Sequence, residues 1–242
     1  MQLPICILLD VIENIPQLSV LCSTNLVPYL LRYYDSDELA VTSINGFGVV
    51  GMLGGDALNA HSTIVSRILM HVSGFRQDSQ LFQVEFDDDQ TLQLKENGIS
   101  SLLKIFISNN FVVSAFEDAA ALWEFTLRNL PLEEDKFEAR KCHKILIDQI
   151  SSGNLVLFGQ NFQYTNTILN LMTELAISVQ SNQESFGTEE YWEDQIIDEA
   201  TLNNIANILK SRLPGIPPEV LMQSIKALPL DKQKLIQLIC IS

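Results

Sequence analysis

Apolar residues recur at helical spacing along most of this chain, and that periodicity restricts the fold more than any other feature. One stripe follows i, i+3, i+4, i+7 and i+11 in a single segment: Ile168, Leu171, Met172, Leu175 and Val179. Another has the same pattern: Ile99, Leu102, Leu103 and Phe106. Such stripes predict amphipathic helices that each bury one face. Only 11 Gly and 8 Pro occur in 242 residues, fewer than a sandwich or barrel of short strands needs.

Local capping signals mark two helix starts. Ser114 followed by Glu117 has the spacing of a capping box, in which the hydroxyl and the carboxylate satisfy first-turn amides. The segment Leu130-Pro131-Leu132 then ends that predicted helix. Asp135 and Glu138 have the same relation at the start of the next one.

The predicted helices form a succession of pairs. Their ranges are about 3–15 with 25–35, 37–54 with 57–73, 91–109 with 114–129, 134–151 with 162–180, and a last group of 195–212, 217–228 and 231–240. Each pair takes roughly 35 to 50 residues, the scale of two-helix repeats of the HEAT or armadillo-like kind. The predicted fold is therefore all-α: an α-α superhelix, or HEAT-repeat solenoid of antiparallel helix pairs. Residues 1–242 are interpreted as a single array of about five pairs.

Two segments, 74–90 and 180–194, depart from the helical pattern. Both are polar, acidic and weakly periodic, so they are predicted to be loops between or within repeats. A solvated loop is the preferred interpretation, because acidic loops are far more common than acidic binding elements. Trp192 is the one place there where an aromatic side chain could anchor a partner protein. It could equally cover an apolar contact within the chain.

The charge balance bears on partners more than on the fold. The chain has 15 Lys and Arg against 30 Asp and Glu, a net charge of −15, while 47% of its residues are apolar. That apolar fraction excludes a disordered acidic tail. The excess of acid argues against direct nucleic-acid binding, which needs clustered basic residues, so a charged partner is expected to be basic. No apolar run approaches the roughly 20 residues that cross a bilayer, so no membrane insertion is expected.

The segment 46–51, Gly-Phe-Gly-Val-Val-Gly, matches the pattern G-x-G-x-x-G. A dinucleotide site of that kind needs a strand before the turn, a full helix after it, and an acidic residue about 20 positions further on. Here Gly54-Gly55 interrupts the helix, and the acids that follow, Asp56 and Asp78, are badly placed. We therefore interpret the three glycines as small helical residues that let the next helix approach closely, with Gly54-Gly55 as the carboxyl-terminal cap.

No metal or catalytic site is predicted. The histidines, His61, His71 and His143, share no i, i+4 spacing, and Asp87-Asp88-Asp89 lacks the alternating ligands and glycine of a calcium loop. That acidic run is interpreted as a solvated turn. No nucleophile and base stand in a recognisable arrangement, although one assembled only by the fold is invisible in sequence. The prediction is a chain that is not an enzyme and uses no cofactor.

Several stretches resemble one family. Residues 5–13 and 40–56, with their Gly-Phe-Gly-Val core, resemble late HEAT repeats of karyopherin-β nuclear import receptors of the importin-β3 type. The strongest match is 129–139, where an L-P-L-x-E-D-K turn joins one repeat to the next. Residues 150–161 and the tail 228–242 are similar to the parts that follow in those receptors.

The resemblance covers essentially the whole chain, in order, and implies the carboxyl-terminal piece of a receptor several times longer. Such receptors shuttle between cytoplasm and nucleus, bind basic cargo signals, touch phenylalanine-glycine repeats of nucleoporins, and release cargo when Ran-GTP binds. The family's principal Ran contacts lie in amino-terminal repeats outside this chain. The segments 74–90 and 180–194, with Thr126 and Asn129, depart from the family pattern and put partner contacts at those positions in doubt.

The same resemblance implies that the second helix of each pair lines a concave face. By the predicted pairing, these helices carry four candidate partner-binding carboxylates: Glu117, Asp118, Glu124 and Glu174. We hypothesise that they attract basic cargo, since opposite charge steers association. Ordinary solvated helix positions are the alternative interpretation and the preferred one. The alternative function is a general HEAT-repeat scaffold subunit of another complex.

Overall fold

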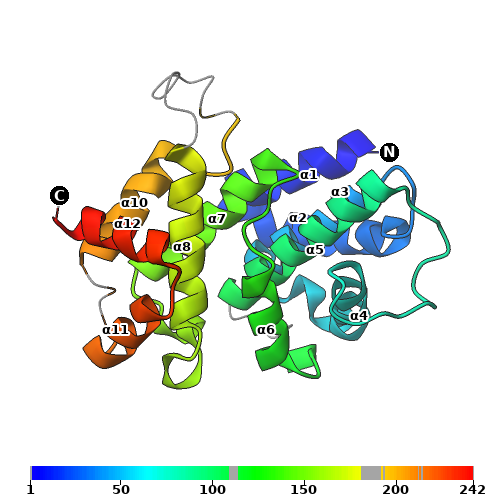
Figure 1. Ribbon diagram of the computed structural model, residues 1–242. Helices are drawn as coiled ribbons and strands as arrows, with labels where there is room; N and C mark the ends of the chain where they lie inside the picture. Colours follow the sequence, from blue (N-terminus) through cyan, green and yellow to red (C-terminus); the bar gives the residue numbers. More distant parts are fainter. Residues whose placement is uncertain are drawn as a thin grey trace. The chain divides into compact units, whose positions relative to one another are not determined.

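The computed structural model describes residues 2–108, 114–180, 192, 194–211, 213 and 215–241. Over these ranges the regular structure is entirely helical, without a strand, so the predicted all-α class is confirmed (Figure 1). Internal contacts divide the chain into two compact units, Met1–Thr126 and Leu127–Ser242. None of the described helices is both long enough and apolar enough to cross a membrane.

The helical elements with defined bounds in the described part of the first unit follow in chain order. They are α1 (Gln2–Asn14), α2 (Pro16–Tyr33), α3 (Ala40–Leu53), the 3-10 helix η1 (Gly55–His61), α4 (Ser62–Val72), α5 (Asp88–Ser108) and α6 (Ala119–Arg128), whose last two residues belong to the second unit. The helix α2 starts nine residues earlier than the predicted 25–35. Pro16 opens it, because proline suits the first helical turn, where its missing N–H has no intrahelical partner.

The core of the first unit lies between α2, α3, α4 and α5. Its fully buried side chains include Leu26, Leu30, Ile44, Phe47, Val50, Ile68, Leu102 and Ile105. Leu102 of the predicted stripe on α5 belongs to this core, and Ile99 and Leu103 of the same stripe are also buried. Burial of each such side chain stabilises the unit by about 1.5–3 kcal/mol.

The glycine motif lies inside α3, where it permits close helix packing. A Cβ atom on Gly48 would lie only 2.6 Å from the Cα of Ser101 on α5, and one on Gly51 would collide with Ile105. The Ser101 hydroxyl also donates to the carbonyl of Ile44 at 2.8 Å. The motif therefore forms no strand-to-helix turn, and its interpretation as a packing surface is confirmed. The close neighbour is α5, however, and not the next helix along the chain.

The predicted start of this helix at Ser114 is wrong. The helix α6 begins at Ala119, and Asp118 lies at its start, accepting from the Ala121 N–H at 3.1 Å. Glu117 therefore lies in the preceding turn and not on the helix. A serine three residues before a glutamate is a local signal, whereas the aspartate next to the helix satisfies a first-turn amide of α6 itself.

The second unit contains the remaining helices. They are α7 (Lys136–Ser151), the 3-10 helices η3 (Leu155–Phe158) and η4 (Gln160–Phe162), α8 (Thr165–Gln180), α10 (Glu199–Lys210), α11 (Pro218–Lys226) and α12 (Leu230–Ile241). The predicted stripe on α8 is buried throughout. Asp135 caps α7 as predicted, accepting from the Phe137 and Glu138 N–H groups at 3.1 and 3.0 Å.

Packing within each unit often joins helices that are not consecutive. In the first unit α3 packs chiefly on α5, and in the second α7 packs on α10 while α8 packs on α11 and α12. Contacts between alternate helices are what stacking of two-helix repeats produces. Most of the predicted loop 180–194 lies outside the described residues, apart from Gln180, Trp192 and Asp194.

Candidate functional site

A non-helical segment between α4 and α5, residues 73–87, folds back over the first unit; we call it the strap. The end of α2 holds it at one point. The Asp35 carboxylate accepts from the N–H groups of Gln83 and Val84 at distances of 2.9 to 3.2 Å, and the Tyr34 hydroxyl donates to the Leu81 carbonyl at 3.0 Å. Leu81 is buried. The strap is thus tied down along its main chain, which the prediction of a solvated loop missed.

The other side of the strap is held by α4. The Arg67 guanidinium donates to the Asp78 carboxylate at 2.6 Å and 3.1 Å, and these hydrogen bonds lower the pKa of that carboxyl. The Asp78 N–H donates to His71 Nδ1 at 2.8 Å. Since Nδ1 accepts, the neutral His71 ring carries its proton on Nε2. Burial lowers the His71 pKa, and the nearby Asp78 charge partly opposes that shift.

The predicted loop also ends earlier than expected, because α5 takes its last three residues. Asp87 lies at the helix start, where its side chain accepts from the Gln90 N–H at 2.8 Å. Asp88 and Asp89 then occupy the first turn, a favourable place for negative charge. The acidic run is therefore a helix start and not only a solvated turn.

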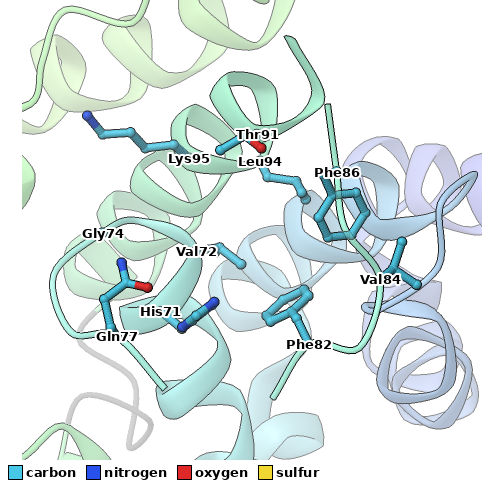
Figure 2. A pocket seen from close by; sticks show the side chains of 10 residues that line it. All are labelled: His71, Val72, Gly74, Gln77, Phe82, Val84, Phe86, Thr91, Leu94 and Lys95. Atoms are coloured by element: carbon cyan, nitrogen blue, oxygen red, sulfur yellow. The ribbon is translucent and has the colours of Figure 1, made fainter. Parts of the chain in front are cut away.

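Beneath the strap lies a pocket of about 430 Å³ (Figure 2). It is lined by His71, Val72, Gly74, Gln77, Phe82, Val84, Phe86, Thr91, Leu94 and Lys95. Phe82 stacks on His71 with ring centroids 5.0 Å apart and meets Phe86 edge-on at 6.0 Å. Figure 2 shows Lys95 leading away from these rings. The lining contains no carboxylate, so in this acidic chain the strap pocket is an apolar, aromatic-walled hollow.

The four predicted carboxylates do not lie together in one unit. Glu117, Asp118 and Glu124 belong to the first unit, and Glu174 belongs to the second. Glu117 is exposed and pairs with Arg76 of the strap, while Asp118 is occupied in capping α6. Glu174 pairs with Lys232 at 2.7 Å. A shared cargo surface for these side chains stays a prediction.

In the second unit, the turn of the strongest sequence match is fixed by a histidine that sequence reasoning did not select. The Leu132 N–H donates to His143 Nε2 at 3.1 Å, and His143 Nδ1 lies 2.9 Å from the Ile196 carbonyl. A main-chain N–H can only donate and a carbonyl can only accept, so the His143 proton is on Nδ1. Burial lowers the His143 pKa to about 4, although the Ile196 hydrogen bond opposes the shift.

No signal in the sequence marks His143 for this role, because its two partners are distant along the chain. The turn itself is visible: Leu130 and Leu132 are buried, and Asp135 caps the helix that follows. The two leucines of the L-P-L-x-E-D segment are thus explained by packing, and its aspartate by capping. Within the described residues, no group of His, Cys, Asp and Glu side chains has the geometry of a metal site.

No protein-family model matches this chain, and no curated protein matches it.

Proposed function

We propose that this chain is the carboxyl-terminal part of a nuclear import receptor, a non-catalytic protein that carries basic cargo through nuclear pores under Ran-GTP control. The observation that carries the proposal is the repeat joint at 129–139, where the family-like leucines are buried and the family-like aspartate caps α7. The all-α fold is compatible with it. The proposed locations are cytoplasm and nucleus, and the proposed partners are basic cargo proteins, nucleoporins and, through repeats outside this chain, Ran.

We place nucleoporin contact in the strap pocket on the chemistry of its lining and not on the family resemblance, because residues 74–90 depart from the family pattern. A phenylalanine side chain needs an apolar hollow in which a ring can meet other rings edge-on or offset. The strap pocket offers Phe82, Phe86 and the His71 ring, and it has a volume in the range of ordinary ligand sites, about 300–1,000 Å³. Its lack of carboxylates suits the uncharged phenylalanine-glycine repeat.

A binding assay with a phenylalanine-glycine repeat peptide tests this function, with a serine-glycine repeat as the control ligand. Val84→Glu puts a charge into the pocket wall while leaving the main-chain bond of Val84 to Asp35 intact. We expect the affinity for the phenylalanine peptide to fall at least about tenfold, because the new carboxylate would lose water when a phenylalanine ring enters the pocket. Val156→Glu is the matched control, since Val156 is 77% exposed in the other unit.

Fluorescence anisotropy of the labelled peptide gives the result. Equal affinity for the two repeat peptides would contradict the nucleoporin role. An equal loss of affinity in Val84→Glu and Val156→Glu would show that the phenylalanine peptide does not bind in the strap pocket. A HEAT-repeat scaffold subunit is the second candidate. The pairing of Glu117 with Arg76 and of Glu174 with Lys232 favours it, because internal pairing leaves less acid for basic cargo. A scaffold would bind neither repeat.

A further inference from the structure

A second hollow, of about 420 Å³, runs along α8 in the second unit. It is lined by Leu127, Arg128, Leu130, Asn166, Thr167, Asn170, Leu171 and Glu174. In contrast to the aromatic strap pocket, this lining is dominated by side chains that donate or accept hydrogen bonds. Its charged members are Arg128 and Glu174.

Three of these residues form a row along one face of α8. Asn166, Asn170 and Glu174 follow one another at four-residue intervals, and each is partly exposed. Four residues of helix rise by about 6 Å. Two residues of an extended strand advance by about 6.7 Å, so alternate peptide groups of a strand match successive members of the row. A side-chain amide donates and accepts as a peptide group does.

The row keeps unused hydrogen-bonding capacity. Asn166 donates through Nδ2 to the Ser224 carbonyl at 2.9 Å, and among the described contacts its Oδ1 accepts nothing. Glu174 makes its contacts with Asn170 and Lys232 through Oε1. Among the described contacts its second oxygen, Oε2, has no donor. Both oxygens are therefore suited to donors from outside the chain.

A lysine of the chain itself already occupies part of the row. The Lys232 Nζ, on α12, donates to Asn170 Oδ1 at 2.6 Å and to Glu174 Oε1 at 2.7 Å. Its side chain is only 11% exposed. The Asn170 amide oxygen and the Glu174 carboxylate thus bind a lysine ammonium together, as their contacts with Lys232 show.

We propose that the α8 row binds an extended, lysine-containing segment of a partner. Asn166 holds one peptide group of its main chain, Asn170 holds the next alternate one once Lys232 has left the Asn170 Oδ1, and Glu174 receives a lysine ammonium. Arg128 lines the same hollow, so its charge disfavours a second lysine beside it. Lys232 then competes with the incoming lysine. The ligand class rests on the proposed cargo function, whereas the mode of binding rests on the row.

The test measures binding of the full chain to a capped synthetic peptide of alternating serine and lysine. A second peptide with the same charges carries N-methyl groups on alternate main-chain nitrogens, which removes those donors. We expect it to bind about tenfold more weakly, the loss of one to two hydrogen bonds. Equal affinities for the two peptides would overturn main-chain recognition and leave only charge attraction.

Variants test the named residues. Asn166→Ala with Asn170→Ala should weaken the serine-lysine peptide about tenfold, whereas Asn204→Ala on α10, whose amide donates to Asp148, should change nothing. Lys232→Met keeps the apolar stem and removes the competitor, so affinity should rise several-fold. A merely destabilised chain would not show that gain, and circular dichroism verifies that each variant is folded.

The binding results distinguish a failure of the α8-row proposal from a failure of the proposed receptor function. If folded Lys232→Met shows no gain, or the double variant matches Asn204→Ala, the α8 row is not the site. If neither the wild type nor Lys232→Met binds the serine-lysine peptide while the phenylalanine-glycine repeat still binds, the row proposal falls and the receptor proposal stands. If neither ligand binds, both fall.

Discussion

Each unit uses a histidine to hold a non-helical segment, and the two histidines differ in burial. His71 in the first unit accepts from the Asp78 N–H of the strap, and His143 in the second accepts from the Leu132 N–H of the repeat joint. His143 is fully buried and uses both ring nitrogens, whereas His71 is half-buried beside an aspartate. The comparison teaches that a hydrogen bond from a main-chain N–H to a histidine holds the segment more firmly in a buried site. There, water cannot replace either partner when the bond breaks.

His143→Ala should have the largest effect. It leaves the Leu132 N–H and the Ile196 carbonyl without their partner in a buried site and adds a cavity, so we expect the unfolding free energy of the second unit to fall by about 3 kcal/mol. Urea denaturation followed by circular dichroism measures the change. Hydrogen exchange should locate it in α7 and the Leu130–Leu132 turn. A loss below about 1 kcal/mol would contradict the role of His143 as a buried clamp.

The next effect is a dependence of stability on pH. The His143 pKa is about 4 in the folded chain against an ordinary value of 6.5, so the unfolded chain binds more protons and stability falls as pH falls below 6.5. From about pH 7.5 to about pH 5 the loss should reach about 2 kcal/mol. Urea midpoints across this range measure it. The slope should become much shallower in His143→Ala, where the smaller effect of the lowered His71 pKa remains, and an unchanged slope there would assign the effect to other groups.

His71→Ala should have the smallest effect of the three. The variant loses one half-buried hydrogen bond and the stacking on Phe82, so about 1 kcal/mol is expected, with the strap loosened and α3 with α5 unaffected. Hydrogen exchange of the Asp78 amide and limited proteolysis of residues 73–87 report on the strap. If His71→Ala destabilised its unit as much as His143→Ala does its own, burial would not be the deciding difference.

Local structure was largely predictable. The stripes on α5 and α8 follow from helical spacing alone, and the Asp135 cap follows from its place before a periodic run. Boundaries failed where two local signals compete. Ser114 and Asp118 both have capping chemistry, and the sequence does not rank them, so α6 was predicted to start too early. The acidic run at 87–89 was likewise assigned to a loop, so the start of α5 at Asp88 was missed.

The candidate site was much less predictable, because its contacts join residues far apart along the chain. Asp35 meets Gln83 and Val84, and Lys232 meets Asn170 and Glu174. None of these pairs has a spacing that a helix or a turn would impose. The strap was therefore predicted to be a solvated loop, although its main-chain groups at Leu81, Gln83 and Val84 and the Asp78 carboxylate anchor it.

The sequence by itself determined the all-α class, most helix positions and the packing role of the α3 glycines, because these depend on periodicity and on side-chain size. Only the tertiary structure decided that α3 packs on α5, that His143 clamps the repeat joint, and that the strap encloses an aromatic pocket. The physical reason is that hydrogen bonds and desolvation act between groups that folding brings together. The separation of two residues along the chain does not predict whether they come into contact.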